Sequence, residues 1–80
     1  MNVQNGLTRA EKQAIIVAAV NACANTDNDN WANLAQVGAA VRQKGLKYGN
    51  LKLMLQSFAP ILEFDEIYEH HAPVTYVRLK

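Results

Sequence analysis

The sequence has one cysteine, two prolines and no long run of apolar residues. A single cysteine cannot form an intramolecular disulfide, which fits a reducing compartment. No stretch approaches the roughly 18 consecutive apolar residues of a membrane-spanning helix. The first residues also lack the basic and then apolar layout of a signal peptide. These absences predict a cytoplasmic domain with no membrane partner.

Patterns typical of catalysis and metal binding are scarce as well. Cys23 lies in a segment rich in Ala and Val, where a structural thiol is expected rather than a nucleophile. His70 and His71 point to opposite sides of an extended chain, and no further Cys or His completes a zinc site beside them. Glu63 and Asp65 fall on the polar face of a predicted strand, with no nucleophile next to them. The sequence therefore predicts no enzyme, no metal site and no cofactor.

The composition that is present suits one small domain. A chain of 80 residues buries only about 60% of its unfolded surface, so every element must share one core. The net charge is only +1, yet residues 42–52 carry four bases and no acid, whereas residues 63–69 carry four acids. Phosphate contacts depend on local clusters of Lys and Arg, so the small net charge still allows a nucleic-acid partner.

Three helices are predicted in the first sixty residues. Residues 8–11 form a capping box that opens a helix over residues 8–24. Asn33 can cap a second helix over residues 34–43, and a third runs from Tyr48 or Gly49 to residue 58. The apolar residues with the spacing of a buried stripe are Ile16, Ala19, Val20 and Cys23 in the first helix and Leu51, Met54, Leu55 and Phe58 in the third.

Two glycines mark the second helix and the turn that follows it. Gly38 lies inside the helix, at a cost of about 1 kcal/mol relative to alanine, which predicts close packing against that position. Gly45 is a natural helix stop. Two short helices joined by a tight turn containing glycine are the signature of a helix-turn-helix.

The period of the apolar residues changes from 3.6 to 2 after Pro60. Residues 61–68 and 74–80 are predicted to be strands, with a turn at residues 70–73, so that they form a hairpin. Trp31 and the alanine after it are predicted to form a short third strand, with the indole in the core. The predicted fold class is α+β, a winged helix-turn-helix with three helices and a β-hairpin wing. The domain spans residues 8–80, after a flexible leader at residues 1–7.

Three segments in this order resemble the LOTUS domain, also called OST-HTH, in its minimal form. They are residues 31–42, which contain Leu-Ala-Gln-Val-Gly, residues 48–55, Tyr-Gly-Asn-Leu-Lys-Leu-Met-Leu, and residues 74–79, Val-Thr-Tyr-Val-Arg-Leu. The family pairs a second helix of the pattern Leu, two or three residues, Gly with a Tyr-Gly step before a Leu-rich third helix. The resemblance covers residues 8–80.

The resemblance implies a winged helix that binds RNA, with a preference for guanine-rich and quadruplex-forming RNA. Bacterial members of the family often lie at the end of a protein that carries a NYN-type ribonuclease domain, so such a domain is expected in the same parent chain. An extended subclass docks a DEAD-box RNA helicase through an additional C-terminal helix. This sequence stops after the hairpin, so helicase docking is the weaker expectation.

Candidate nucleic-acid-binding residues gather around the turn before the third helix. The Lys and Arg side chains can neutralise phosphates, and the backbone amides at the start of that helix offer an anion site. Tyr48 can either stack on a base or cover the helix junction as a core residue, and the sequence leaves both roles open. The full candidate set is Arg42, Lys44, Lys47, Tyr48, Gly49, Asn50, Lys52 and Arg78.

Two other functions remain as alternatives to RNA binding. The first is a protein-interaction module that uses exposed apolar area to hold a helicase or a second copy of itself. The second is a winged helix that binds duplex DNA, although the third helix has few polar groups to recognise base edges: Asn50, Lys52, Gln56 and Ser57. RNA binding that weakens steeply with salt is the leading prediction.

Overall fold

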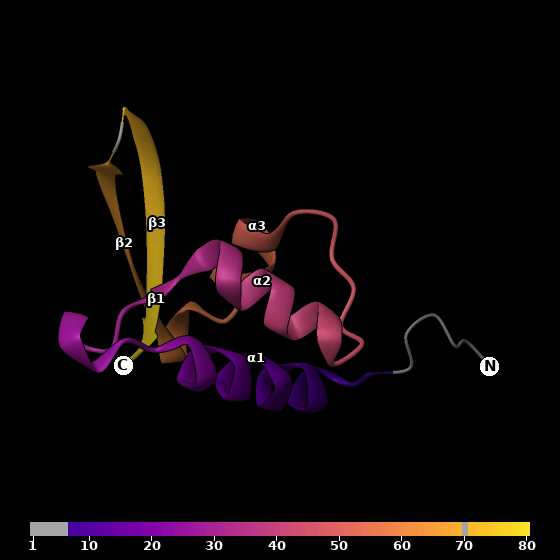
Figure 1. Ribbon diagram of the computed structural model, residues 1–80. Coiled ribbons are helices and arrows are strands. Elements are labelled where there is room, and N and C mark those ends of the chain that lie inside the picture. Colours follow the sequence, from indigo (N-terminus) through magenta and orange to yellow (C-terminus); the bar gives the residue numbers. More distant parts are fainter. Residues whose placement is uncertain (1–6, 70) are drawn as a thin grey trace.

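The computed structural model describes residues 7–69 and 71–80, and within them the chain forms a small α+β domain (Figure 1). The elements in chain order are α1 (Arg9–Cys23), η1 (Thr26–Asn28), β1 (Ala32–Asn33), α2 (Leu34–Gln43), α3 (Leu51–Gln56), η2 (Ala59–Ile61), β2 (Leu62–Glu69) and β3 (Ala72–Leu79). The strands of this part of the chain form one antiparallel sheet in the order β1-β3-β2. The predicted succession of three helices and a hairpin is therefore confirmed. Residues 1–6 of the predicted leader lie outside the described residues.

The capping box predicted for α1 is confirmed. The Thr8 hydroxyl accepts a hydrogen bond from the Glu11 amide at 3.1 Å, and the Thr8 amide donates to the Glu11 carboxylate at 2.8 Å. Two of the backbone donors at the start of the helix are thus satisfied. The stripe behind it is buried at Ile16, Ala19 and Val20, as expected from its spacing.

The third helix is shorter than predicted, because it begins at Leu51 and not at Tyr48 or Gly49, and ends at Gln56 and not at residue 58. The Asn50 side chain accepts a hydrogen bond from the Leu53 amide at 3.0 Å. Asn favours this capping role over a place inside a helix, so the helix starts after it. The turn before it is closed by Gly45, which has a φ of +89° and ends α2 as predicted.

Trp31 does not occupy the core, so that prediction is wrong. The residue forms an isolated bridge with Asn25, and its half-buried indole lies 4.2 Å below the guanidinium of Arg78. β1 begins at the next residue, Ala32, which pairs with Val77 and is fully buried. Successive side chains of an extended chain point to opposite faces, so only one of these two neighbours can face inward.

The hairpin is longer than predicted, because β3 begins at Ala72 and includes Pro73. Proline cannot donate to a neighbouring strand, yet β1 pairs only with Tyr76 and Val77. One side of β3 is therefore unpaired at Pro73, where proline is tolerated. The predicted turn also included His70, which lies outside the described residues.

The hydrophobic core lies where the three helices meet one face of the sheet. Its buried residues are Ile16, Ala19, Val20, Ala32, Val37, Val41, Leu46, Leu55, Phe58, Leu62 and Val77. Burial ends part-way along the hairpin, whose outer half extends beyond the helices (Figure 1). The helices and the outer hairpin therefore present two separate surfaces.

Candidate nucleic-acid interface

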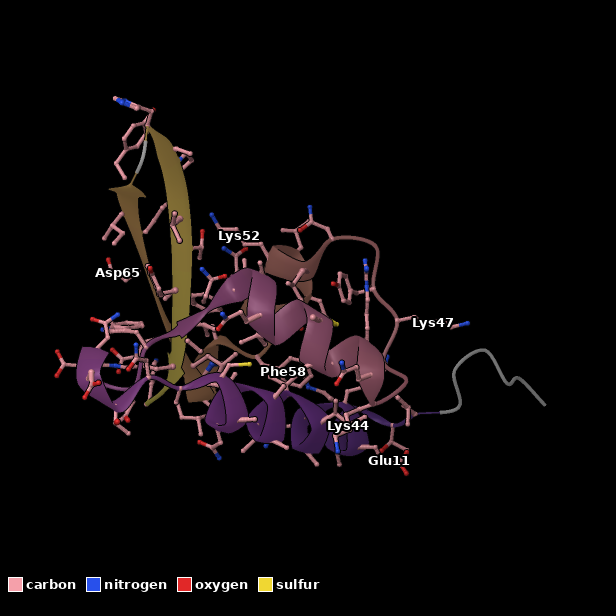
Figure 2. The ribbon with its side chains drawn as sticks, in the orientation of Figure 1. Glu11, Lys44, Lys47, Lys52, Phe58 and Asp65 are labelled. Carbon is pink, nitrogen blue, oxygen red and sulfur yellow. The ribbon has the colours of Figure 1, made fainter. Side chains whose placement is uncertain are left out.

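Charge is divided between two parts of the molecule. Helices α1 and α2 run in opposite directions, so the start of α1 lies beside the end of α2 (Figure 1). Five of the 8 Lys and Arg residues lie there or in the turn that follows, and we call them the basic end: Arg9, Lys12, Arg42, Lys44 and Lys47. Glu11 is the one acid on the same elements. Figure 2 shows Lys44 and Lys47 at this end and Asp65 on the distant hairpin.

The six remaining acids lie in or beside η1 and along β2. They are Asp27, Asp29, Glu63, Asp65, Glu66 and Glu69. A near-neutral sequence thus folds into a molecule with one strongly basic region and one strongly acidic region. The basic region is the place where phosphate groups would be attracted.

The turn between α2 and α3 is held in place by a core residue. Leu46 is only 1% exposed, and its amide donates to the carbonyl oxygen of Val41 at 3.0 Å. Lys44 and Lys47 flank Leu46 and are both exposed. The buried Leu46 side chain fixes the backbone of the turn and therefore the points from which the two lysine side chains extend into solvent. This role of Leu46 was not predicted. The sequence does carry a signal for it, because Leu46 is an isolated apolar residue within a basic turn.

Tyr48 packs against α2 at Gly38, which confirms the close packing predicted there. A Cβ atom added at Gly38 would lie 2.8 Å from the Tyr48 hydroxyl and 2.6 Å from Leu51 Cδ2. The guanidinium of Arg42 lies 4.8 Å from the centre of the tyrosine ring. Tyr48 is half-buried in this position, so much of its ring is occupied by contacts within the domain.

A surface pocket of about 310 Å³ opens between α1, the α2–α3 turn and the end of α3. It is lined by Arg9, Lys12, Lys47, Tyr48, Gly49, Met54, Ser57 and Phe58. Three of these residues are cations and none is an acid. The guanidinium of Arg9 lies 4.1 Å above the Phe58 ring, and its Nη2 donates to the carbonyl oxygen of Ser57. The pocket therefore contains one cation in a fixed orientation and two lysines.

Arg9 and Lys12 were not predicted from the sequence as members of this site. Their spacing of three residues places both on one face of α1, which is a signal that the sequence carries. Their proximity to Lys47, however, depends on how α1 packs beneath the α2–α3 turn. Such a contact between residues more than thirty positions apart is not encoded in any local pattern.

The structure separates Lys52 and Arg78 from the other candidate bases. Lys52 Nζ lies 3.5 Å from Glu66 Oε2 on β2. Arg78 Nε donates to Glu63 Oε2 at 2.9 Å, and its Nη1 donates to the carbonyl oxygen of Asp29 at 2.8 Å. Both bases thus lie among acids and are held by them.

The backbone amides predicted as an anion site lie before the first turn of the third helix. The amides of Tyr48 and Gly49 precede α3, and the Leu53 amide is already bonded to the Asn50 side chain. Asn50 is therefore a helix cap. Gly49 lies in open space, since an added Cβ atom would meet nothing within 4 Å.

Residues 7–69 and 71–80 contain neither a candidate metal site nor a candidate membrane-spanning helix. No three His, Cys, Asp or Glu side chains in these ranges are grouped so that they could hold a metal ion. His70, one of the two histidines for which no zinc site was predicted, lies outside these ranges. None of the helices described there is long and apolar enough to cross a membrane.

Protein-family models, curated proteins and solved structures were compared with the chain, and none matched. Support for a function therefore comes from the geometry and charge of the basic end.

Proposed function

We propose that this domain is a winged helix-turn-helix of the LOTUS type and that it binds RNA at its basic end. In this proposal the hairpin is the wing, and β1 is its short third strand next to Trp31. The observation that carries the proposal is the gathering of five bases around one pocket and one anchored turn, with a single acid near them. Lys and Arg clusters of this kind bind phosphates and release counterions.

The cations of the basic end are available to a ligand. In the described part of the chain, the ion pairs with carboxylates involve Lys52 and Arg78 and none of the five bases of the basic end. Their positive charge is therefore not offset by a neighbouring acid within 4 Å. A phosphate that approaches this end replaces water and salt ions and displaces no carboxylate of the protein.

The hairpin and α3 are poorly suited to a nucleic acid. β2 carries four acids, which repel phosphates. Helix α3 has six residues, about 9 Å of helix, and its exposed side presents Leu53 at 63% exposure beside the paired Lys52. This surface offers little to recognise base edges in a major groove, which disfavours binding of duplex DNA.

A second candidate function is protein binding at the hairpin and α3. Tyr68 is 73% exposed and Leu53 is 63% exposed, and Ile67 on β2 is also exposed. These large apolar side chains lie away from the basic end, so a protein contact there would leave the basic end accessible. Such binding would depend on apolar area and would change little with salt.

A titration with three nucleic acids at two salt concentrations tests the proposal. Guanine-rich RNA, the same bases in scrambled order, and duplex DNA are compared by fluorescence anisotropy. The expected result is RNA binding that weakens with salt. The slope of log K against log salt should reach about −3.5 if all five Lys and Arg side chains of the basic end contact phosphates of a single strand. The scrambled strand is equally rich in guanine, so tighter binding of the ordered strand would support the preference for quadruplex-forming RNA that the LOTUS resemblance implies. Absence of binding to any of them at low salt would refute the proposed function.

A further inference from the structure

We infer that the pocket at the basic end holds one unpaired nucleotide of an RNA strand. In this arrangement the base stacks on the guanidinium of Arg9, and the phosphate lies between Lys12 and Lys47. The inference rests on the proposed RNA-binding function and assigns a ligand to one place within that site.

The size of the pocket indicates the scale of the ligand that it suits. Its volume of about 310 Å³ lies at the lower end of the range for small-molecule sites, roughly 300–1,000 Å³. One nucleotide is a ligand of that scale, whereas a base pair or a tetrad of four guanines is too large. If the RNA is a quadruplex, the pocket would therefore take a loop nucleotide and not the face of a tetrad.

Arg9 provides the flat surface on which a base can stack. Phe58 also lines the pocket but is only 3% exposed, so little of its ring is open to a ligand. The exposed Arg9 guanidinium lies over that ring and is fixed by its hydrogen bond to the Ser57 carbonyl oxygen. Bases stack on guanidinium planes in RNA complexes. A guanidinium that is already oriented loses less conformational entropy when the base binds.

Lys12 and Lys47 place positive charge on two walls of the same pocket. Lys12 lies one helical turn after Arg9 on α1, and Lys47 comes from the turn that Leu46 anchors. No carboxylate lines the pocket. The two ammonium groups therefore suit a phosphate next to the stacked base.

A base can stack on Arg9 only if it has left its own helix. In double-stranded RNA both faces of each base are covered by its neighbours, and proteins recognise sequence mainly in unpaired regions. The inference therefore predicts tighter binding of single-stranded RNA than of a duplex of the same length.

Three single substitutions in the full chain test this assignment, with a fluorescent single-stranded RNA as the probe. Arg9→Lys keeps the positive charge and removes the planar guanidinium group. Lys12→Gln removes a positive charge inside the pocket. Lys44→Gln removes a charge of the same end outside the pocket and is the matched control. We expect Arg9→Lys to weaken binding at least about fivefold, the lower limit for the loss of one stacked base. We expect Lys12→Gln to weaken binding more than Lys44→Gln does.

The possible failures can be told apart. If the wild-type domain binds no RNA, the proposed function and this inference both fall. If it binds RNA but Arg9→Lys and Lys12→Gln weaken affinity no more than Lys44→Gln does, the pocket assignment is overturned while RNA binding stands. Equal affinity for duplex and single-stranded RNA would also overturn it. If GMP or AMP alone binds as tightly as the strand, the pocket belongs to a free nucleotide instead. If Arg9→Lys lowers the melting temperature, Lys12→Gln decides the result, since the Lys12 side chain makes no hydrogen bond, ion pair or ring contact within residues 7–69 and 71–80.

Discussion

Replacing Gly38 by alanine should disturb the packing that positions the α2–α3 turn. The new Cβ atom would lie 2.6 Å from Leu51 Cδ2 and 2.8 Å from the Tyr48 hydroxyl, both too close for an ordinary contact. Alanine gains about 1 kcal/mol over glycine inside a helix, but overpacking costs about 1–3 kcal/mol. We therefore expect a net loss of up to about 2 kcal/mol, with Tyr48 displaced from α2. Each kcal/mol lowers Tm by about 4–8 °C in a domain of this size.

Thermal unfolding followed by circular dichroism measures this effect, and Gly49→Ala is its matched control. Gly49 has open space around it and does not have a positive φ, so alanine there should leave Tm unchanged or raise it slightly. Combining Gly38→Ala with Tyr48→Phe removes the hydroxyl from the clash and should restore part of the stability. A Gly38→Ala protein that gains the full stability of about 1 kcal/mol that alanine brings to a helix interior, and that binds RNA as the wild type does, would refute the packing argument.

Two further predictions concern the anchor of the turn and the separation of its bases. Leu46→Ala should lower the free energy of unfolding by about 2–5 kcal/mol because it leaves a cavity in the core. Leu53→Ala, at an exposed position, should change it by at most about 0.5 kcal/mol. Urea unfolding compares the two variants, and equal effects would contradict the burial of Leu46. Lys47→Gln should weaken RNA binding and lower its salt slope by about 0.7, whereas Lys52→Gln, which removes a base already paired with Glu66, should change neither. Equal effects from the two lysines would show that α3 also contacts the RNA.

Local signals predicted the elements of this fold well. The capping box at Thr8 and the glycine at position 45 each act through neighbouring backbone groups, so their effects can be read from a few residues. The start of α3 was missed because an apolar stripe does not locate a helix boundary, whereas the cap at Asn50 does. Trp31 was predicted to lie in the core because of its size. Side chains alternate in direction along an extended chain, and in the structure it is Ala32 that faces inward.

The site was only partly predictable, because its composition depends on contacts between distant parts of the chain. Lys44 and Lys47 were found as neighbours in the sequence. Arg9 joins them through its packing on Phe58, a residue 49 positions later in the chain, just after the end of α3. The pairing of Arg78 with Glu63 follows from the register of the hairpin, which no charge count reveals. Charge clusters in a sequence thus identify candidate bases, and the fold determines which of them share a surface.

The salt dependence of RNA affinity tests most directly whether the basic end is the binding surface. The affinity of single-stranded RNA is measured across a range of salt concentrations for the wild type and for the double variant Lys44→Gln, Lys47→Gln. If both lysines meet phosphates, the slope of log K against log salt should become shallower by about 1.4, or about 0.7 for each phosphate that is no longer neutralised. An unchanged slope, with the variant still folded, would show that these bases do not contact the RNA and would contradict the proposal.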